Sequence, residues 1–159
     1  MKPLFLALLP FLAAAALSGA GFQQENFNKY TLQEMPYEVC TLPPGEKEAE
    51  AFGVMPTTAK GAKRLYDKGA AFYDARRTAH YTKGHIMHAL PIRFDNAIGE
   101  YVLARLPEDK AAPLVFYCYG PDCASSFEAA RAVADQGYKK VYWLLSGYHA
   151  WEKAGYPVQ

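Results

Sequence analysis

The sequence predicts a single α/β domain in which a central, mostly parallel sheet is flanked by helices on both faces. Short apolar segments of strand length alternate with segments that carry helix caps, a pattern typical of parallel sheets covered by crossover helices. The chain of 159 residues has room for one domain plus a leader. Because 51% of the residues are apolar and 14% are aromatic, the chain is expected to be globular rather than disordered.

The first twenty residues have the features of a cleavable signal peptide. A positive start at Met1-Lys2 precedes the apolar run Leu4–Leu17, and the small residues Ser18-Gly19-Ala20 follow it. We expect a mature chain that starts near Gly21, is periplasmic or secreted, and has no membrane attachment after cleavage. The alternative is a transmembrane anchor, but the run is short for a hydrocarbon core roughly 30 Å thick.

Residues 21–56 are expected to be an irregular N-terminal extension, and residues 57–159 the domain. Several prolines interrupt regular structure in the extension, and we expect one short helix there, over Lys47–Phe52. The domain then opens with a helix capped by Thr57 or Thr58 and ended near Lys68-Gly69, where glycine suits a left-handed cap.

The rest of the domain continues the alternation of strands and helices. Leu114–Cys118 is the strongest strand signal, because it is continuously apolar, β-branched or aromatic. The elements expected in chain order are a strand over 70–74, a strand over 89–92, a helix over 96–106, a strand over 114–118, a helix over 125–136 closed by Gly137, a strand over 141–144 and a helix over 147–154.

The charge and the histidine pattern exclude several classes of function. A formal net charge of +1 without a basic cluster argues against a nucleic-acid partner. His80, His85 and His88 are spaced poorly for a compact ligand set, so we expect no metal site. We expect no cofactor and a monomer.

Cys118 is the candidate nucleophile. Ligands of open parallel sheets bind at the carboxyl ends of the strands, and Cys118 lies at such an end, before a loop and a helix. Loop N–H groups and the positive end of a helix dipole favour the thiolate, which is the reactive form of cysteine. The accessory residues expected around it, which include hydroxyls able to donate hydrogen bonds or cap the helix, are Tyr119, Gly120, Asp122, Cys123, Ser125 and Ser126.

A second group lies at the end of the preceding strand. Asp74 and Arg76 are expected to hold the loop by hydrogen bonds, and His85 to pack structurally. Arg76 or Arg77 could also reach the site and supply a positive charge to a substrate. The sequence does not decide between holding the loop and supplying charge to a substrate.

Export gives the three cysteines, Cys40, Cys118 and Cys123, an oxidising environment in a Gram-negative host. Because three is odd, at least one thiol is free or bonded to another molecule. Cys118 and Cys123 could close a disulfide, or Cys123 could resolve a persulfide formed on Cys118.

These residues resemble the rhodanese (sulfurtransferase) superfamily over roughly Thr57–Val158. The segments that carry the resemblance are Asp74-Ala75-Arg76 with Gly84-His85-Ile86-Met87-His88-Ala89, Phe116-Tyr117-Cys118, Gly137-Tyr138-Lys139-Lys140-Val141, and Ser146-Gly147-Tyr148-His149-Ala150-Trp151 with Gly155-Tyr156-Pro157-Val158. His88 stands where the family usually has glycine. The resemblance implies the rhodanese fold and sulfane-sulfur transfer through a persulfide on Cys118, between a small sulfur donor and a thiophilic acceptor.

The active loop departs from the family pattern, because the position of the family's arginine holds Cys123 or Ser125, depending on the alignment. A guanidinium binds oxyanions through two parallel hydrogen bonds, so its loss predicts poor use of thiosulfate. The loop is also similar to a paired-cysteine subgroup found near quinoprotein oxidation systems, which implies a periplasmic redox or quinoprotein partner; Ala124 replaces the subgroup's tryptophan. The alternatives to a sulfurtransferase are a thiol–disulfide protein that uses Cys118 and Cys123, a catalytically weak binding module, and a phosphatase of the same fold.

Overall fold

The computed structural model describes residues 29–31, 44–95, 100–103 and 105–159. The expected signal peptide, most of the expected extension and Cys40 lie outside these ranges. Among the described residues, no helix is long and apolar enough to cross a membrane.

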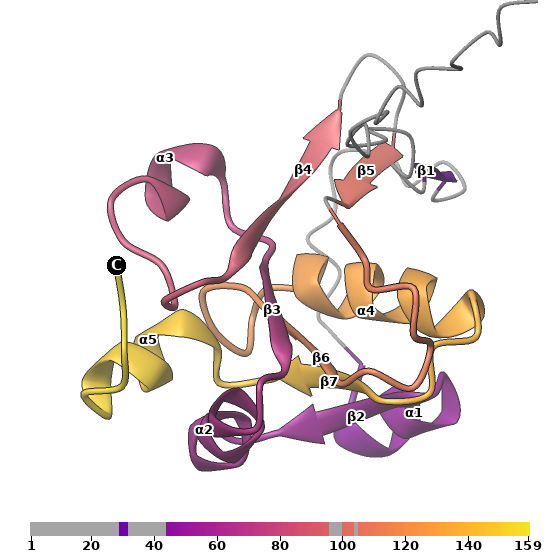
Figure 1. Ribbon diagram of the computed structural model, residues 1–159, viewed down its shortest axis with the longest axis horizontal. Coiled ribbons are helices and arrows are strands. Elements are labelled where there is room, and N and C mark those ends of the chain that lie inside the picture. Colours follow the sequence, from indigo (N-terminus) through magenta and orange to yellow (C-terminus); the bar gives the residue numbers. More distant parts are fainter. Residues whose placement is uncertain (1–28, 32–43, 96–99, 104) are drawn as a thin grey trace, which may run out of the picture.

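A twisted sheet forms the centre of the domain (Figure 1). Its parallel part has five strands, in the spatial order β4-β3-β6-β7-β2. These strands are β2 (Val54–Thr57), β3 (Ala71–Asp74), β4 (Leu90–Asp95), β6 (Leu114–Tyr117) and β7 (Val141–Leu144). The antiparallel strands β5 (Glu100–Leu103) and β1 (Lys29–Thr31) extend the sheet beyond β4.

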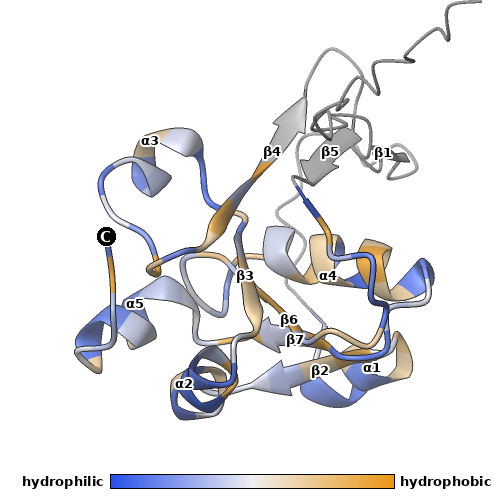
Figure 2. Ribbon diagram, in the orientation of Figure 1, coloured by the Kyte–Doolittle hydropathy of each residue, from blue (hydrophilic) through white to orange (hydrophobic). Residues whose placement is uncertain are grey.

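Helices cover both faces of the parallel strands, which confirms the expected fold class. On one face, α1 (Glu46–Ala51) and α4 (Ser125–Asp135) pack on a core that contains Phe116, Phe127 and Trp143. On the other face, α2 (Ala59–Asp67) and α5 (Gly147–Lys153) pack on a core that contains Phe72, Val115 and Trp151. The inner strands are apolar and the outward sides of the helices are polar (Figure 2). A sheet buried on both faces needs strands that are apolar throughout, and all four residues of β6 are buried.

Sequence patterns located most of these elements. Thr58 is the N-cap of α2, where its side chain accepts a hydrogen bond from the backbone N–H of Gly61. Gly69 and Gly137 follow α2 and α4 with positive φ angles of 81° and 89°, as expected of left-handed C-terminal caps. The short helix α3 (Thr78–Tyr81), between β3 and β4, was not expected.

The helix expected over 96–106 is wrong. Residues 100–103 form β5, which pairs antiparallel with β4 in the register Ile92↔Leu103 to Asp95↔Glu100. The aromatic and β-branched pair Tyr101-Val102 favours a strand, and tertiary pairing with β4 outweighs a weak helical pattern. Residues 96–99 and 104 lie outside the described ranges.

The segment before residue 57 also contains more regular structure than expected. Residues 54–57 form β2, the edge strand that pairs in parallel with β7, and Ala49 of α1 is fully buried in the core. This strand contains Pro56, and proline is tolerated in an edge strand. The boundary between extension and domain stays a prediction.

Candidate functional site

The expected nucleophile lies where the parallel strands end. Cys118 directly follows β6 and is 1% exposed. Its backbone carbonyl accepts a hydrogen bond of 2.9 Å from the N–H of Tyr148 at the start of α5, and the carbonyl of Tyr119 accepts one of 3.4 Å from His149. The first half of the loop is therefore fixed to α5.

Close packing at Gly147 strengthens this attachment. Gly147 has a φ of 64°, and a Cβ atom at this position would overlap the backbone of Tyr119. Only glycine allows α5 to approach the loop this closely. The hydroxyl of the neighbouring Ser146 is buried and has no hydrogen-bond partner among the described residues.

A disulfide joins Cys118 to Cys123, with a Cα–Cα distance of 6.1 Å. Cys123 is partly exposed, whereas Cys118 is buried. Within the closed loop, the N–H of Cys123 donates to the carbonyl of Gly120 over 3.2 Å, which forms a turn. Asp122 is exposed on this turn. The structure therefore represents the oxidised protein. The sequence left open whether Cys118 and Cys123 pair.

Several backbone N–H groups of this loop and of the helix after it have no acceptor among the described residues. The amides of Tyr119, Gly120 and Asp122 have no acceptor within the described part of the chain. The first turn of α4 begins at Ser125 and adds N–H groups that no intrahelical carbonyl can satisfy. Such groups, together with the helix dipole, favour negative charge near the loop.

The two serines differ from expectation. The N-cap of α4 is Ala124, and no side chain caps the helix, so neither Ser125 nor Ser126 has that role. Ser126 is buried, and its Oγ accepts a hydrogen bond of 3.1 Å from the indole N–H of Trp143. Ser126 therefore fixes α4 to β7, and Ser125 stays partly exposed at the helix start.

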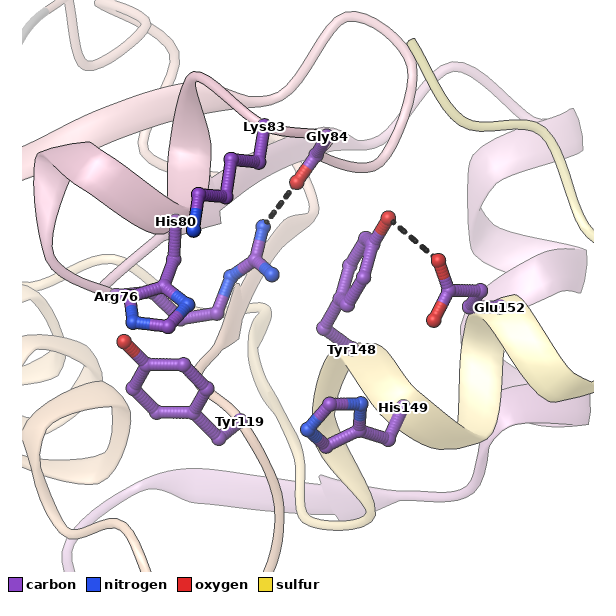
Figure 3. A pocket seen from close by; sticks show the side chains of 8 residues that line it. All are labelled: Arg76, His80, Lys83, Gly84, Tyr119, Tyr148, His149 and Glu152. Carbon is purple, nitrogen blue, oxygen red and sulfur yellow. Dashed lines mark hydrogen bonds between the residues drawn. The ribbon is translucent and has the colours of Figure 1, made fainter.

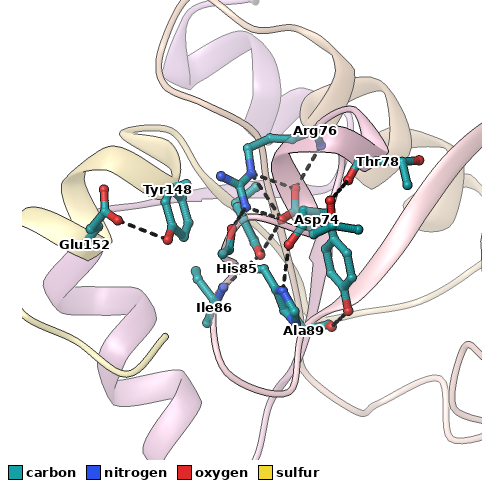
Figure 4. Close-up of polar contacts among 12 residues, drawn as sticks. Asp74, Arg76, Thr78, His85, Ile86, Ala89, Tyr148 and Glu152 are labelled. Carbon is teal, nitrogen blue, oxygen red and sulfur yellow. Dashed lines mark hydrogen bonds and ion pairs between the residues drawn. The ribbon is translucent and has the colours of Figure 1, made fainter. Parts of the chain in front are cut away.

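Asp74 and Arg76 form a buried ion pair beside the loop (Figure 4). The guanidinium donates to both carboxylate oxygens at 2.7–3.1 Å and to the carbonyl of Gly84 at 2.7 Å. The hydroxyl of Tyr117 also donates to Asp74, over 2.7 Å, and accepts from the N–H of Ile86. The expected loop-holding role of Asp74 and Arg76 agrees with this geometry.

These contacts shift the ionisation of the network. Burial alone would lower the pKa of Arg76, but the hydrogen bonds and the charge of Asp74 outweigh it and raise this pKa above its usual value. Burial, followed by the charge of Asp74 and its hydrogen bond, raises the pKa of Tyr117 far above its usual range. The guanidinium of Arg76 therefore stays charged and the phenol of Tyr117 neutral at physiological pH.

Arg77 and His85 lie outside this network. Arg77 is exposed at the N-cap of α3, and its side chain makes no capping hydrogen bond. The ring of His85 stacks on Tyr81 at 3.8 Å between centroids, and its two nitrogens contact the carbonyl of Tyr81 and the side chain of Gln159, each over 2.9 Å. His85 therefore packs structurally, as expected.

A pocket of about 250 Å³ opens beside the loop, between α3 and α5 (Figure 3). The side chains that line it include Arg76, Lys83, Tyr119, Tyr148, His149 and Glu152, with His80 against the ring of Tyr119. The guanidinium of Arg76 stacks on Tyr148, 3.8 Å from the ring centroid. The phenol of Tyr148 donates to Glu152 over 3.2 Å, and burial followed by this bond raises the pKa of Tyr148.

Sequence reasoning did not identify most of this pocket. Lys83, Tyr148, His149 and Glu152 lie within or beside the segments that served only to recognise the fold, and no local pattern marks them. The three histidines once considered as metal ligands separate: His80 lines this pocket, His85 packs on Tyr81, and His88 lines a different hollow. The described residues include no group of three or more histidines, cysteines or carboxylates placed to hold a metal ion.

Comparisons with known proteins agree with this architecture. A family model described as the rhodanese-like domain matches residues 58–154. The thiosulfate sulfurtransferase GlpE of Pseudomonas fluorescens is 33% identical over 99 residues, which cover 62% of this chain and 84% of that protein. The enzyme of the same name from Coxiella burnetii is 34% identical over 90 residues, or 54% of this chain and 73% of that protein.

Solved structures show the same fold. A protein of unknown function from Rhodopseudomonas palustris, described as a possible tyrosine phosphatase, superimposes with a TM-score of 0.54 and 25% identity over 79% of this chain and 100% of that chain. The rhodanese-like domain of an Anabaena protein gives a TM-score of 0.50 and 22% identity, over 65% of this chain and 77% of that one.

Proposed function

Because the chain belongs to the rhodanese-like family, we propose that it is a sulfurtransferase that carries sulfane sulfur as a persulfide on Cys118. The observation that supports this most is the position of Cys118 at the carboxyl end of β6, at the start of a loop whose N–H groups at Tyr119, Gly120 and Asp122 have no acceptor among the described residues. These groups can stabilise a thiolate and the anionic terminal sulfur of a persulfide.

The disulfide must open before transfer begins. Two thiols of a small reductant supply two electrons: the Cys118–Cys123 bond breaks, both cysteines become thiols, and the reductant leaves as its own disulfide. Cys123 is the more exposed residue of the two, so its sulfur is the expected point of attack, which releases Cys118 as the leaving thiolate.

Transfer then takes two steps. The Cys118 thiolate attacks the terminal sulfur of a persulfide donor, forms the Cys118 persulfide and releases the donor thiolate. An acceptor thiolate next attacks that terminal sulfur and restores Cys118. Alternatively, the Cys123 thiolate attacks the inner sulfur, which reforms the disulfide and releases hydrosulfide.

We propose organic persulfides, rather than thiosulfate, as the better donors. The loop between Cys118 and Ser126 contains no arginine or lysine, and Asp122 adds a negative charge. A charge-assisted hydrogen bond is worth about 1.5–3 kcal/mol, so the absence of a guanidinium within the loop itself should weaken productive thiosulfate binding at Cys118 at least roughly tenfold. The same absence counts against phosphatase chemistry.

The second candidate function is thiol–disulfide exchange with an exported redox or quinoprotein partner, and the Cys118–Cys123 disulfide favours it. The intact mass of reduced, desalted protein before and after a persulfide donor separates the two. We expect a gain of one sulfur, located on Cys118. Return of the two-hydrogen deficit without any sulfur-bearing species would favour exchange, and an inert dithiol would favour a binding module.

A further inference from the structure

The pocket beside the loop presents hydrogen-bond donors that the fold does not use. Arg76 is 5% exposed, and its Nε and Nη2 atoms are occupied by Asp74 and Gly84. Its other terminal nitrogen, Nη1, has no partner within the described ranges. A guanidinium fixed on one side and free on the other is prepared for an anionic group.

A second cation lies at the same end of the pocket. Figure 3 shows the Lys83 side chain reaching toward Arg76 and His80. Lys83 forms no ion pair with another described residue. A carboxylate placed here could bind the ammonium of Lys83 and the free edge of Arg76 together.

The opposite end of the pocket has the reverse character. Glu152 lies across the pocket from Lys83 in Figure 3, and within the described ranges only its Oε1 accepts a hydrogen bond, from the phenol of Tyr148. The rings of Tyr119 and Tyr148 also line the pocket. A carboxylate beside aromatic rings suits an ammonium group.

The size of the pocket limits the ligand further. The pocket volume of about 250 Å³ is several times the roughly 30 Å³ that a water molecule occupies in the liquid. This space exceeds what thiosulfate needs and suits a small amino acid. Tyr119 lines the pocket and directly follows Cys118 in the sequence, so the pocket lies beside the loop that carries the reactive cysteine.

We propose that this pocket binds the α-amino and carboxylate groups of a cysteine-type thiol or persulfide, with the carboxylate at Arg76 and Lys83 and the ammonium at Glu152. The proposal rests on the proposed function and names the substrate class of that site.

Histidine imidazole signals provide a direct binding test. The chain has four histidines, of which His80 and His149 line the pocket and His88 does not. Titration of the oxidised protein with the unreactive probe S-methyl-L-cysteine should shift His80 and His149 with one common dissociation constant, and leave His88 unmoved. Equal shifts at His88, no shifts, or a stronger response to thiosulfate would overturn the proposal.

Variants identify the two ends of the site. Lys83→Met and Glu152→Gln should each raise the dissociation constant of the probe about tenfold, whereas Lys139→Met should leave it unchanged. Lys139 is an exposed lysine before β7, at the other end of the parallel strands. If all three variants bind alike, the assignment is wrong.

A set of four thiols tests whether the occupant reacts. L-cysteine has both charged groups, 3-mercaptopropionate only the carboxylate, cysteamine only the ammonium, and 2-mercaptoethanol neither. The rate of opening of the Cys118–Cys123 disulfide, normalised to thiolate concentration, should be highest for L-cysteine, and Lys83→Met should remove the advantage of the carboxylate. Equal rates for all four thiols would overturn the proposal. None of these measurements needs sulfur transfer, so they can succeed where the mass test of the Cys118 persulfide fails.

Discussion

Cys118 and Cys123 share one disulfide but have different surroundings, and this difference supports the roles proposed for them. Cys118 is buried at a strand end and its carbonyl is held by α5, whereas Cys123 is partly exposed on the turn that follows. A nucleophile benefits from a fixed position, and a resolving thiol from freedom to approach it.

We therefore expect Cys118→Ser to abolish persulfide formation and Cys123→Ser to retain it. Without Cys123, the disulfide cannot reform, so the Cys118 persulfide should survive longer after the donor is removed. Mass spectrometry of the donor-treated variants measures both effects, with Cys40→Ser as the control that leaves them unchanged. A persulfide that persists in Cys118→Ser and disappears in Cys123→Ser would show that Cys123, and not Cys118, is the nucleophile.

His88 occupies a backbone conformation that its side chain disfavours. Its φ is 66°, in the left-handed region that favours glycine. The left-handed conformation costs a non-glycine residue roughly 1–2 kcal/mol, partly offset by the greater freedom of glycine in the unfolded chain.

His88→Gly should consequently raise the free energy of unfolding by about 0.5–1 kcal/mol. Urea denaturation at constant m-value measures this change, and His88→Ala is the matched control that should give no gain. A loss of stability in His88→Gly would show that contacts of the imidazole outweigh the backbone strain.

At the level of elements, α4 contains one carboxylate in an unfavourable environment. Burial raises the pKa of Glu128 above its ordinary value, and the nearby Arg131 opposes this shift only in part. The folded protein therefore binds a proton at Glu128 more readily than the unfolded chain. The stabilisation that Glu128 contributes is fully present when the pH is below its pKa in the unfolded chain. It is lost as the pH rises through the higher pKa of Glu128 in the folded protein.

Glu128→Gln should increase the melting temperature at neutral pH and have little effect below about pH 4, where wild-type Glu128 is protonated in both states. Thermal unfolding across this pH range measures the difference. A constant difference at every pH would show that the effect does not arise from ionisation.

Elements were easier to predict than the site that they build. Caps such as Thr58 and Gly137 and the apolar run of β6 act locally, so the sequence predicts them directly. The register of β5 on β4 depends on distant pairing, and the helix expected over 96–106 was wrong for that reason. Cys118, Asp74 and Arg76 were recognisable by their order in the family pattern. Lys83, His149 and Glu152 meet only in the folded chain, so no local signal marks the pocket.

At the scale of the whole molecule, export would set the redox environment of the loop. The run Leu4–Leu17 followed by Ser18-Gly19-Ala20 predicts cleavage before Gly21 and export. N-terminal sequencing of protein from the periplasmic fraction of the host should begin at or within a few residues of Gly21. Retention of Met1 on membrane-embedded protein would contradict this prediction.

The attachment of α5 to the loop has a consequence for motion. The Tyr148 amide donates to the carbonyl of Cys118, and Gly147 packs closely against the backbone of Tyr119. The Cys123 amide, in contrast, has only the longer hydrogen bond to the carbonyl of Gly120. Reduction should therefore free one half of the loop only. In hydrogen–deuterium exchange, the Cys123 amide should exchange faster after reduction while the Tyr148 amide keeps its protection; equal acceleration of both would contradict this. The loop would thus act as a one-sided hinge, and the nucleophile would keep the same position in every redox state.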